Sequence, residues 1–99
     1  MIARRWRGWT RAEDADEYLR YIRETGLQEY RDTPGNRGAW TLRREDGDRV
    51  EFVTLSFWAS MEAVKAFAGP EPDRAVYYPE DERFLVEQED TVDHYELFD

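Results

Sequence analysis

Hydrophobic residues along the chain alternate between strand-like and helix-like spacing, and the order of these segments predicts the fold. Residues 2–9 indicate a first strand, although three arginines make it unusually polar. Apolar residues then recur at helical spacing over residues 12–22, with charged residues on the remaining faces. This spacing predicts an amphipathic helix, begun by a capping box between Thr10 and Glu13 and ended by Gly26.

The middle of the chain has the pattern of a hairpin. The Pro-Gly pair at 34–35 suits a type II turn, and a strand is expected near residues 39–45. The Asp-Gly pair at 46–47 is a favoured two-residue hairpin signal. The return strand, residues 49–58, carries apolar residues at both odd and even positions. A strand with one solvated face alternates, so this pattern predicts a strand that is covered on both faces.

The last third of the chain completes the order of elements. Ser60 is expected to begin a second helix that Gly69 ends. Residues 70–90 contain three prolines and indicate broken helical pieces, and residues 91–98 form the last strand. The order β-α-β-β-α-β predicts an α+β, ferredoxin-like fold, with a four-stranded antiparallel sheet and both helices on one face. We expect a single domain over residues 1–99.

Aromatic residues are too numerous for a lone core of this size. Four Trp, six Tyr and five Phe make up 15% of the 99 residues, and small domains bury a smaller share of their surface than large ones. The sheet face that carries no helix must therefore meet something other than water. Two copies packed sheet on sheet are the simplest answer, which predicts a homodimer. The alternative is a monomer that exposes an apolar sheet face.

Charge and composition narrow the range of partners. Residues 1–49 carry a net charge of +1 and residues 50–99 a net charge of −10, which sum to −9. Such an acidic surface predicts neither a nucleic-acid nor a membrane partner, because binding to either depends on Lys and Arg. An RNA-binding domain shares the order of elements, but its third-strand signature would need small residues where Val50 and Glu51 stand.

Other classes of site have little support in the sequence. There is no cysteine, and therefore no disulfide framework or thiolate metal site. The acidic run at 80–82 suits the start of a helix, where consecutive positions diverge, so no metal site is expected. No apolar run is long enough to span a membrane or to serve as a signal peptide, and we expect a cytoplasmic protein.

Several segments of the chain resemble the antibiotic biosynthesis monooxygenase family of dimeric α+β barrels. They are residues 34–38, the strand-to-helix junction 57–67, residues 74–85 and the closing segment 92–97. The resemblance implies the fold and the homodimer predicted above. It fixes the reaction less well, since that family contains quinol oxygenases, haem degraders and proteins without assigned activity, and function belongs to the site rather than to the fold.

The chain departs from the haem-degrading branch of that family. Members of the branch use an Asn on the first strand, a Trp in the second helix and a His in the segment that follows. Here the first strand offers Arg4 but no Asn, Phe67 takes the aromatic position, and no His lies between residues 60 and 90. We therefore expect no haem, and no other cofactor.

Cofactor-free oxygenation of a phenol or quinol is what the resemblance implies instead. Such a reaction needs an aromatic pocket between sheet and helices, a base, and a donor for the developing oxyanion. His94 is the candidate catalytic base, as the only side chain whose ordinary pKa lies near neutrality. The candidate substrate-binding residues are Trp6, Trp58, Tyr77 and Tyr78 in the cavity wall, and Arg4 or Asn36 at an anionic oxygen.

Each of these candidates also has a structural interpretation. His94 suits a hydrogen-bonded position in a sheet, Trp58 suits core or dimer packing, and Asn36 belongs first to a turn. Tyr77 and Tyr78 suit anchors for the broken helical segment, and Arg4 suits an ion pair with the acidic second half of the chain across the sheet or the dimer. The alternative function is a non-catalytic homodimer that binds a small hydrophobic ligand or serves only in assembly. It explains the aromatic residues without requiring a base.

Overall fold

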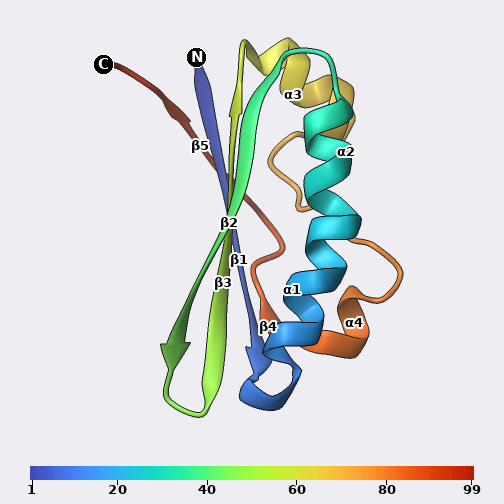
Figure 1. The fold of residues 1–99 in the computed structure, drawn as a ribbon. Helices are drawn as coiled ribbons and strands as arrows, with labels where there is room; N and C mark the ends of the chain where they lie inside the picture. Colours follow the sequence, from blue (N-terminus) through green and yellow to red (C-terminus); the bar gives the residue numbers. More distant parts are fainter.

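Strands from all parts of the chain form one antiparallel sheet, and the helices cover a single face of it (Figure 1). The computed structural model describes all of residues 1–99. The strands are β1 (Ile2–Arg11), β2 (Asn36–Asp46), β3 (Arg49–Trp58), β4 (Leu85–Gln88) and β5 (Asp93–Glu96). The helices are α1 (Ala15–Glu24), α2 (Gly26–Asp32), α3 (Met61–Ala68) and α4 (Asp81–Phe84), with a 3₁₀ turn, η1 (Ala12–Asp14), before α1.

The sheet confirms the predicted ferredoxin-like order, with one change at the sheet edge next to β1. The order is β2-β3-β1, and both β4 and β5 then pair with β1. β5 pairs with Ile2–Arg5 and β4 with Gly8–Thr10, so two short strands stand where one was predicted. Between them the backbone turns away from β1, because Ala75 N donates to Asp90 O and Val92 N to Asp73 O.

The first helix begins and ends differently from the prediction. Thr10 stays in β1, fully buried between Val50 and Leu85, and its hydroxyl donates to the Arg11 carbonyl. The predicted capping box is therefore wrong, because strand pairing on both sides holds Thr10 in the extended conformation. Gly26 does not end the helical segment either; Thr25 interrupts it, and α2 begins at Gly26.

Turns and caps in the middle of the chain follow the sequence more closely. Gly35 has φ +92°, as the third position of a type II turn requires. Gly47 has φ +67° and opens a two-residue loop at 47–48, one residue later than predicted, which suits a type II′ hairpin. Ser60 Oγ accepts a hydrogen bond from Ala63 N at 3.2 Å, and Gly69 ends α3 with φ +89°, so both predicted ends of that helix are confirmed.

Residues 70–90 differ most from the expectation of helical pieces. Only α4 is helical, with four residues, and β4 follows it directly. The three prolines of this stretch lack the N–H that a helix needs, and the segment from residue 70 to residue 80 is irregular. This irregular segment, here called the covering segment, lies over the helix-bearing face of the sheet.

The two faces of the sheet are not equally covered. The even residues of β3 from Val50 to Trp58 are buried beneath the helices. The opposite surface, here called the open face, leaves Trp40 51% and Leu42 49% exposed. Its centre is polar, because Arg7 and Arg44 both bond to the buried carboxylate of Glu51. On this face of β3, Val53, Leu55 and Phe57 are already partly covered within one chain, and full cover on both faces stays a prediction tied to the homodimer.

Candidate small-molecule site

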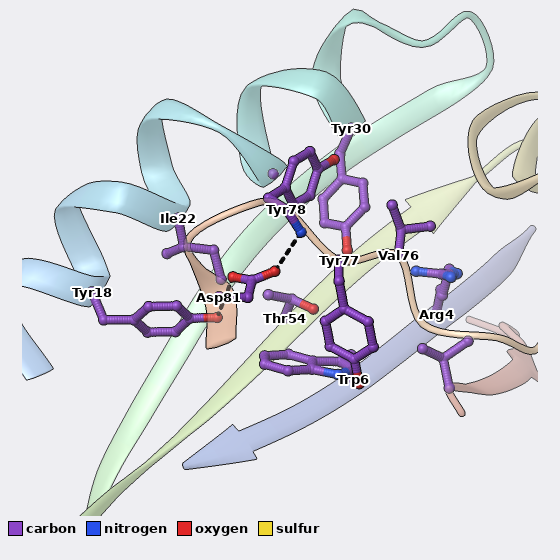
Figure 2. Close-up of a pocket in the computed structure, with 12 residues that line it drawn as sticks. Arg4, Trp6, Tyr18, Ile22, Tyr30, Thr54, Val76, Tyr77, Tyr78 and Asp81 are labelled. Carbon is purple, nitrogen blue, oxygen red and sulfur yellow. Dashed lines mark hydrogen bonds between the residues drawn. The ribbon is translucent and has the colours of Figure 1, made fainter. Parts of the chain in front are cut away.

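A cavity lies between the helix-bearing face of the sheet and the covering segment (Figure 2). β1 and β3 form its floor, α1 and α2 form one wall, and residues 76–78 with α4 close it. The volume open to the centre of a water molecule is about 20 Å³, which is room for about one water. The aromatic side chains of the lining are Trp6, Tyr18, Tyr30, Tyr77 and Tyr78.

Elementary periodicity places these side chains together. Arg4 and Trp6 are two residues apart on β1 and therefore share a face, and Thr54 of β3 pairs with Trp6. Tyr18 and Ile22 are four residues apart on α1, so both point down onto the same strip of sheet. The floor is thus polar at the arginine and threonine and apolar elsewhere.

Asp81 supplies a buried carboxylate to the cavity. It is 7% exposed, its Oδ2 accepts from Tyr78 N at 2.6 Å, and its Oδ1 accepts from Tyr18 OH at 3.4 Å. Burial raises the pKa of Asp81 above its ordinary value, and the hydrogen bonds from Tyr78 N and Tyr18 partly oppose that rise. Burial also raises the pKa of Tyr18, so its hydroxyl keeps its proton and remains a donor.

Arg4 supplies a buried cation. Its side chain is 2% exposed, its Nη2 donates to the Arg74 carbonyl at 3.2 Å, and its guanidinium lies 5.5 Å from the centre of the Phe67 ring. Burial lowers the pKa of Arg4, while the neighbouring Tyr30 hydroxyl opposes that change. An arginine remains protonated in proteins all the same, so the cavity contains a full positive charge.

The covering segment must move before anything larger than water enters. Tyr77 OH donates to the Glu89 carbonyl at 2.7 Å, and Tyr78 OH donates to Glu29 at 2.8 Å. Each contact fastens the covering segment to a different element, to the end of β4 and to α2 respectively. Both bonds are exposed, and the segment is also held by Ala75 N–Asp90 O, Val92 N–Asp73 O and Arg4 Nη2–Arg74 O, so its opening requires several hydrogen bonds to break together.

Replacing Tyr78 by phenylalanine is expected to loosen this cover. The variant loses the Tyr78–Glu29 bond, and one net hydrogen bond is worth about 1 kcal/mol. Amide exchange at Ala75 and Tyr78, measured by hydrogen–deuterium exchange, should become about 5-fold faster. Tyr95→Phe, at an exposed tyrosine on the open face, is the matched control. Equal exchange in the wild type and Tyr78→Phe would show that Glu29 does not hold the segment.

The structure brings together four of the seven residues expected from the sequence. Arg4, Trp6, Tyr77 and Tyr78 all line the cavity. Trp58 lies outside it: it is fully buried, it packs edge-on against Tyr30, and its Nε1 donates to Ser56 Oγ at 2.9 Å.

Asn36 and His94 also lie outside the cavity lining. Asn36 Oδ1 accepts from Gly38 N at 3.0 Å, at an irregularity at the start of β2. His94 is opposite Arg4 in the β1–β5 pairing, and its Nδ1 lies 3.0 Å from an oxygen of Asp73. The placement of His94 beside the cavity, rather than in it, gives it no direct path to a ligand there.

Eight of the twelve lining residues were not among the sequence-based candidates, and four of these eight carry polar side-chain groups: Asp81, Tyr18, Tyr30 and Thr54. Tyr18 falls within the apolar stripe at residues 12–22 that predicts the first helix, and that pattern marks it only as a core residue. Asp81 was hidden in an acidic run, where its neighbours Glu80 and Glu82 are exposed. No local signal distinguishes it from them; the start of α4 turns it inward.

Comparison with known proteins identifies the fold. No protein-family model and no curated protein matches the chain. Among solved structures, Rv0793 from Mycobacterium tuberculosis is similar with a TM-score of 0.65 and 19% identity, over 99% of this chain and 95% of that one. A crystal structure of a MhuD mutant, with two manganese protoporphyrin IX molecules bound per active site, is similar with a TM-score of 0.58 and 20% identity, over 98% and 94%.

The chain has the fold of these two proteins. This agreement confirms the ferredoxin-like α+β architecture that the sequence and its resemblance to the antibiotic biosynthesis monooxygenases predict. At this level of identity the likeness concerns the fold alone, and the site must be judged from its own residues.

A metalloporphyrin does not fit the residues of this cavity. Its lining contains no histidine that could serve as an axial ligand. Burial raises the pKa of both Tyr18 and Tyr78, which disfavours the ionised phenolate that would bind iron. Nowhere in the chain is a group of three or more His, Asp or Glu side chains placed to hold a metal ion. Separately, none of the helices is both long and apolar enough to cross a membrane.

Proposed function

We propose that the chain binds a small phenol or quinol in the cavity and oxygenates it without a cofactor. One observation carries the proposal: a buried carboxylate, Asp81, faces an aromatic-lined cavity that also holds a buried cation. Resemblance to the antibiotic biosynthesis monooxygenases supplies the class of reaction. A cytoplasmic location remains the prediction from the sequence.

Asp81 is the base in this proposal, in place of His94. A carboxylate whose pKa is raised is a better match for a phenolic proton than an ordinary aspartate, because base strength increases with pKa. Both of its oxygens already accept one hydrogen bond, from Tyr18 and from Tyr78 N, which fixes their direction. Each retains a second lone pair for the substrate hydroxyl.

The reaction balances without an external reductant. Asp81 takes the hydroxyl proton, and the electron-rich ring passes one electron to O₂ before the resulting radical pair joins to form a C–O bond. The O–O bond of that peroxide then breaks, one oxygen stays on the ring as a quinone carbonyl, and the other leaves as water. The hydroxyl proton and the displaced ring proton both end in that water, and the substrate supplies all the electrons.

We also propose that the protein works as a homodimer through the open face. Trp40 and Leu42 are half exposed there, and Trp40 packs on Phe57, whose ring centre lies 5.7 Å away. On β5, Tyr95 is also exposed on this face, because it lies opposite Ala3 of β1. Monomers seldom leave so many large apolar side chains on one sheet face, and a second copy of the same face buries them by symmetry.

Oxygen uptake under air tests the proposed reaction. A panel of phenols, hydroquinones and naphthoquinols is added to the wild type, and oxygen consumption and quinone formation are followed together. The expected result is one oxygen consumed for each quinone formed. Tight binding without oxygen uptake throughout the panel would identify a non-catalytic binding module. If no compound of the panel were bound or oxidised, the cavity would not be the binding site for this class of substrate.

Tyr18→Phe is expected to shift the pH profile of that activity. Activity needs ionised Asp81, so it should rise with pH through the raised pKa of this carboxyl. Tyr18 lowers the pKa of Asp81 by hydrogen bonding to it, so its removal should move the rise to higher pH. The rate at the plateau should stay within about threefold, since a single weak neutral bond is lost. If Tyr18→Phe and the wild type had the same pH profile, the group whose ionisation controls activity would not be Asp81.

A further inference from the structure

Arg4 is buried without a counter-ion. It makes one hydrogen bond, from Nη2 to the Arg74 carbonyl, and its Nε is buried with no partner at all. The next two arginines of β1 differ, because Arg5 pairs with Asp93 and Arg7 with both Glu51 and Glu89. Of these three arginines, only the one that faces the cavity lacks a carboxylate.

The groups around Arg4 do not replace that counter-ion. The Phe67 ring and the Tyr30 hydroxyl are neutral, and the carboxylate of Asp73 is bonded to His94. Burying an unpaired charge costs several kcal/mol, whereas the same charge facing an anion at hydrogen-bond distance is strongly favourable. A ligand that carries a permanent anion would satisfy both the charge and the free Nε–H.

Asp81 and Arg4 lie at opposite ends of the cavity, with Tyr30, Thr54 and Trp6 between them (Figure 2). A phenolic oxygen that is deprotonated by Asp81 is therefore not the group that Arg4 receives. The two ends of the cavity are complementary to two different functional groups on one ligand, and the aromatic walls are complementary to a flat ring between them.

We propose that the ligand of this site is a hydroxylated aromatic carboxylate, with its carboxylate on Arg4 and its hydroxyl on Asp81. This inference rests on the proposed use of the cavity and adds the substrate class. The carboxylate takes the place of the Arg74 carbonyl on the Arg4 guanidinium and also accepts from the free Nε. Since Arg74 belongs to the covering segment, that exchange releases one of its attachments as the ligand enters.

Two probes of equal shape test the assignment. 4-Hydroxybenzoate and 4-hydroxybenzamide differ in the charge of one group, and their dissociation constants are measured by isothermal titration calorimetry. The wild type should bind the carboxylate at least 10-fold more tightly than the amide. Arg4→Met should weaken carboxylate binding by roughly 100-fold or more and leave amide binding within about threefold. Arg20→Met, at an exposed position on α1, is the control for losing one positive charge.

The comparison within the wild type does not depend on how Arg4→Met folds, and Arg4→Lys provides a second variant that keeps the charge but loses the planar fork. A carboxylate that binds no better than the amide, including the case in which neither binds, overturns the inference. Oxygen uptake with neutral quinols together with that result would leave the proposed reaction standing. A clear preference for the carboxylate without any oxygen uptake would support the inferred ligand class and contradict the proposed reaction.

Discussion

Replacing Leu42 by glutamate is expected to convert the proposed homodimer into monomers at micromolar concentration. Leu42 lies on β2 in the open face and is 49% exposed within one chain, so the subunit itself should fold as before. In the proposed dimer, its carboxylate would be buried between two sheets, where the neighbouring Arg7 and Arg44 are already paired with Glu51, and burying a charge in place of an apolar contact costs several kcal/mol. The dissociation constant, measured by sedimentation equilibrium, should rise roughly 100-fold or more.

Gln28→Glu is the matched control for that substitution. It adds the same charge at an exposed position of α2, on the helix layer rather than on the open face. Its dissociation constant should equal that of the wild type. An unchanged dissociation constant for Leu42→Glu would place the interface elsewhere, and a wild type that sediments as a single subunit would remove the dimer.

Asp81→Asn is expected to lower the rate of oxygenation by about 100-fold or more, the usual contribution of a general base. Asparagine keeps the shape of the side chain and can still accept from Tyr78 N, but it cannot take a phenolic proton. Ligand affinity should change much less than the rate. Steady-state oxygen consumption and direct titration separate the two effects.

Glu82→Gln neutralises a neighbouring carboxylate that is exposed, and it should retain full activity. If Asp81→Asn and Glu82→Gln were equally active, the base would not be Asp81, and His94→Ala would become the next variant to measure.

Folding stability provides an internal check on Asp81→Asn. The folded-state pKa of Asp81 is raised, so its favourable contribution to stability is present below the unfolded-state pKa and is lost as pH rises through the folded-state pKa. Asp81→Asn avoids this loss. Its free energy of unfolding should therefore match or exceed that of the wild type at pH 7, and the difference should shrink toward acid pH.

Most of the fold follows from local patterns, and the exceptions have physical causes. Ser60 and Gly69 bound α3 as predicted because capping is a local property of the backbone. Thr10 and Gly26 are equally good local signals, yet strand pairing keeps Thr10 in β1 and α2 resumes directly at Gly26. In both cases tertiary contacts outweigh preferences worth about 1 kcal/mol.

Site residues could be predicted from the sequence only where the spacing of residues along a strand or helix fixes the face on which a side chain lies. Period-two spacing on β1 places Arg4 and Trp6 on one face, and the sequence alone therefore supports both as cavity residues. His94 is on the same face by register, but the covering segment brings Asp73 to it, and no sequence pattern foretells that contact. Asp81 depends on the same irregular segment, and was missed for the same reason.

Nuclear magnetic resonance of the four tryptophan indole N–H groups tests the central claim, that a phenol binds between the sheet and the helices. Trp6 lines the cavity, and Trp40 lies on the open face. Trp9 lies near the end of β1, away from the cavity, and its indole N–H donates to Asp46. On titration with hydroquinone under argon, the Trp6 signal should shift most, while those of Trp9 and Trp40 stay in place. A titration that moves Trp9 or Trp40 and leaves Trp6 unchanged, or that moves none at saturation, would contradict it.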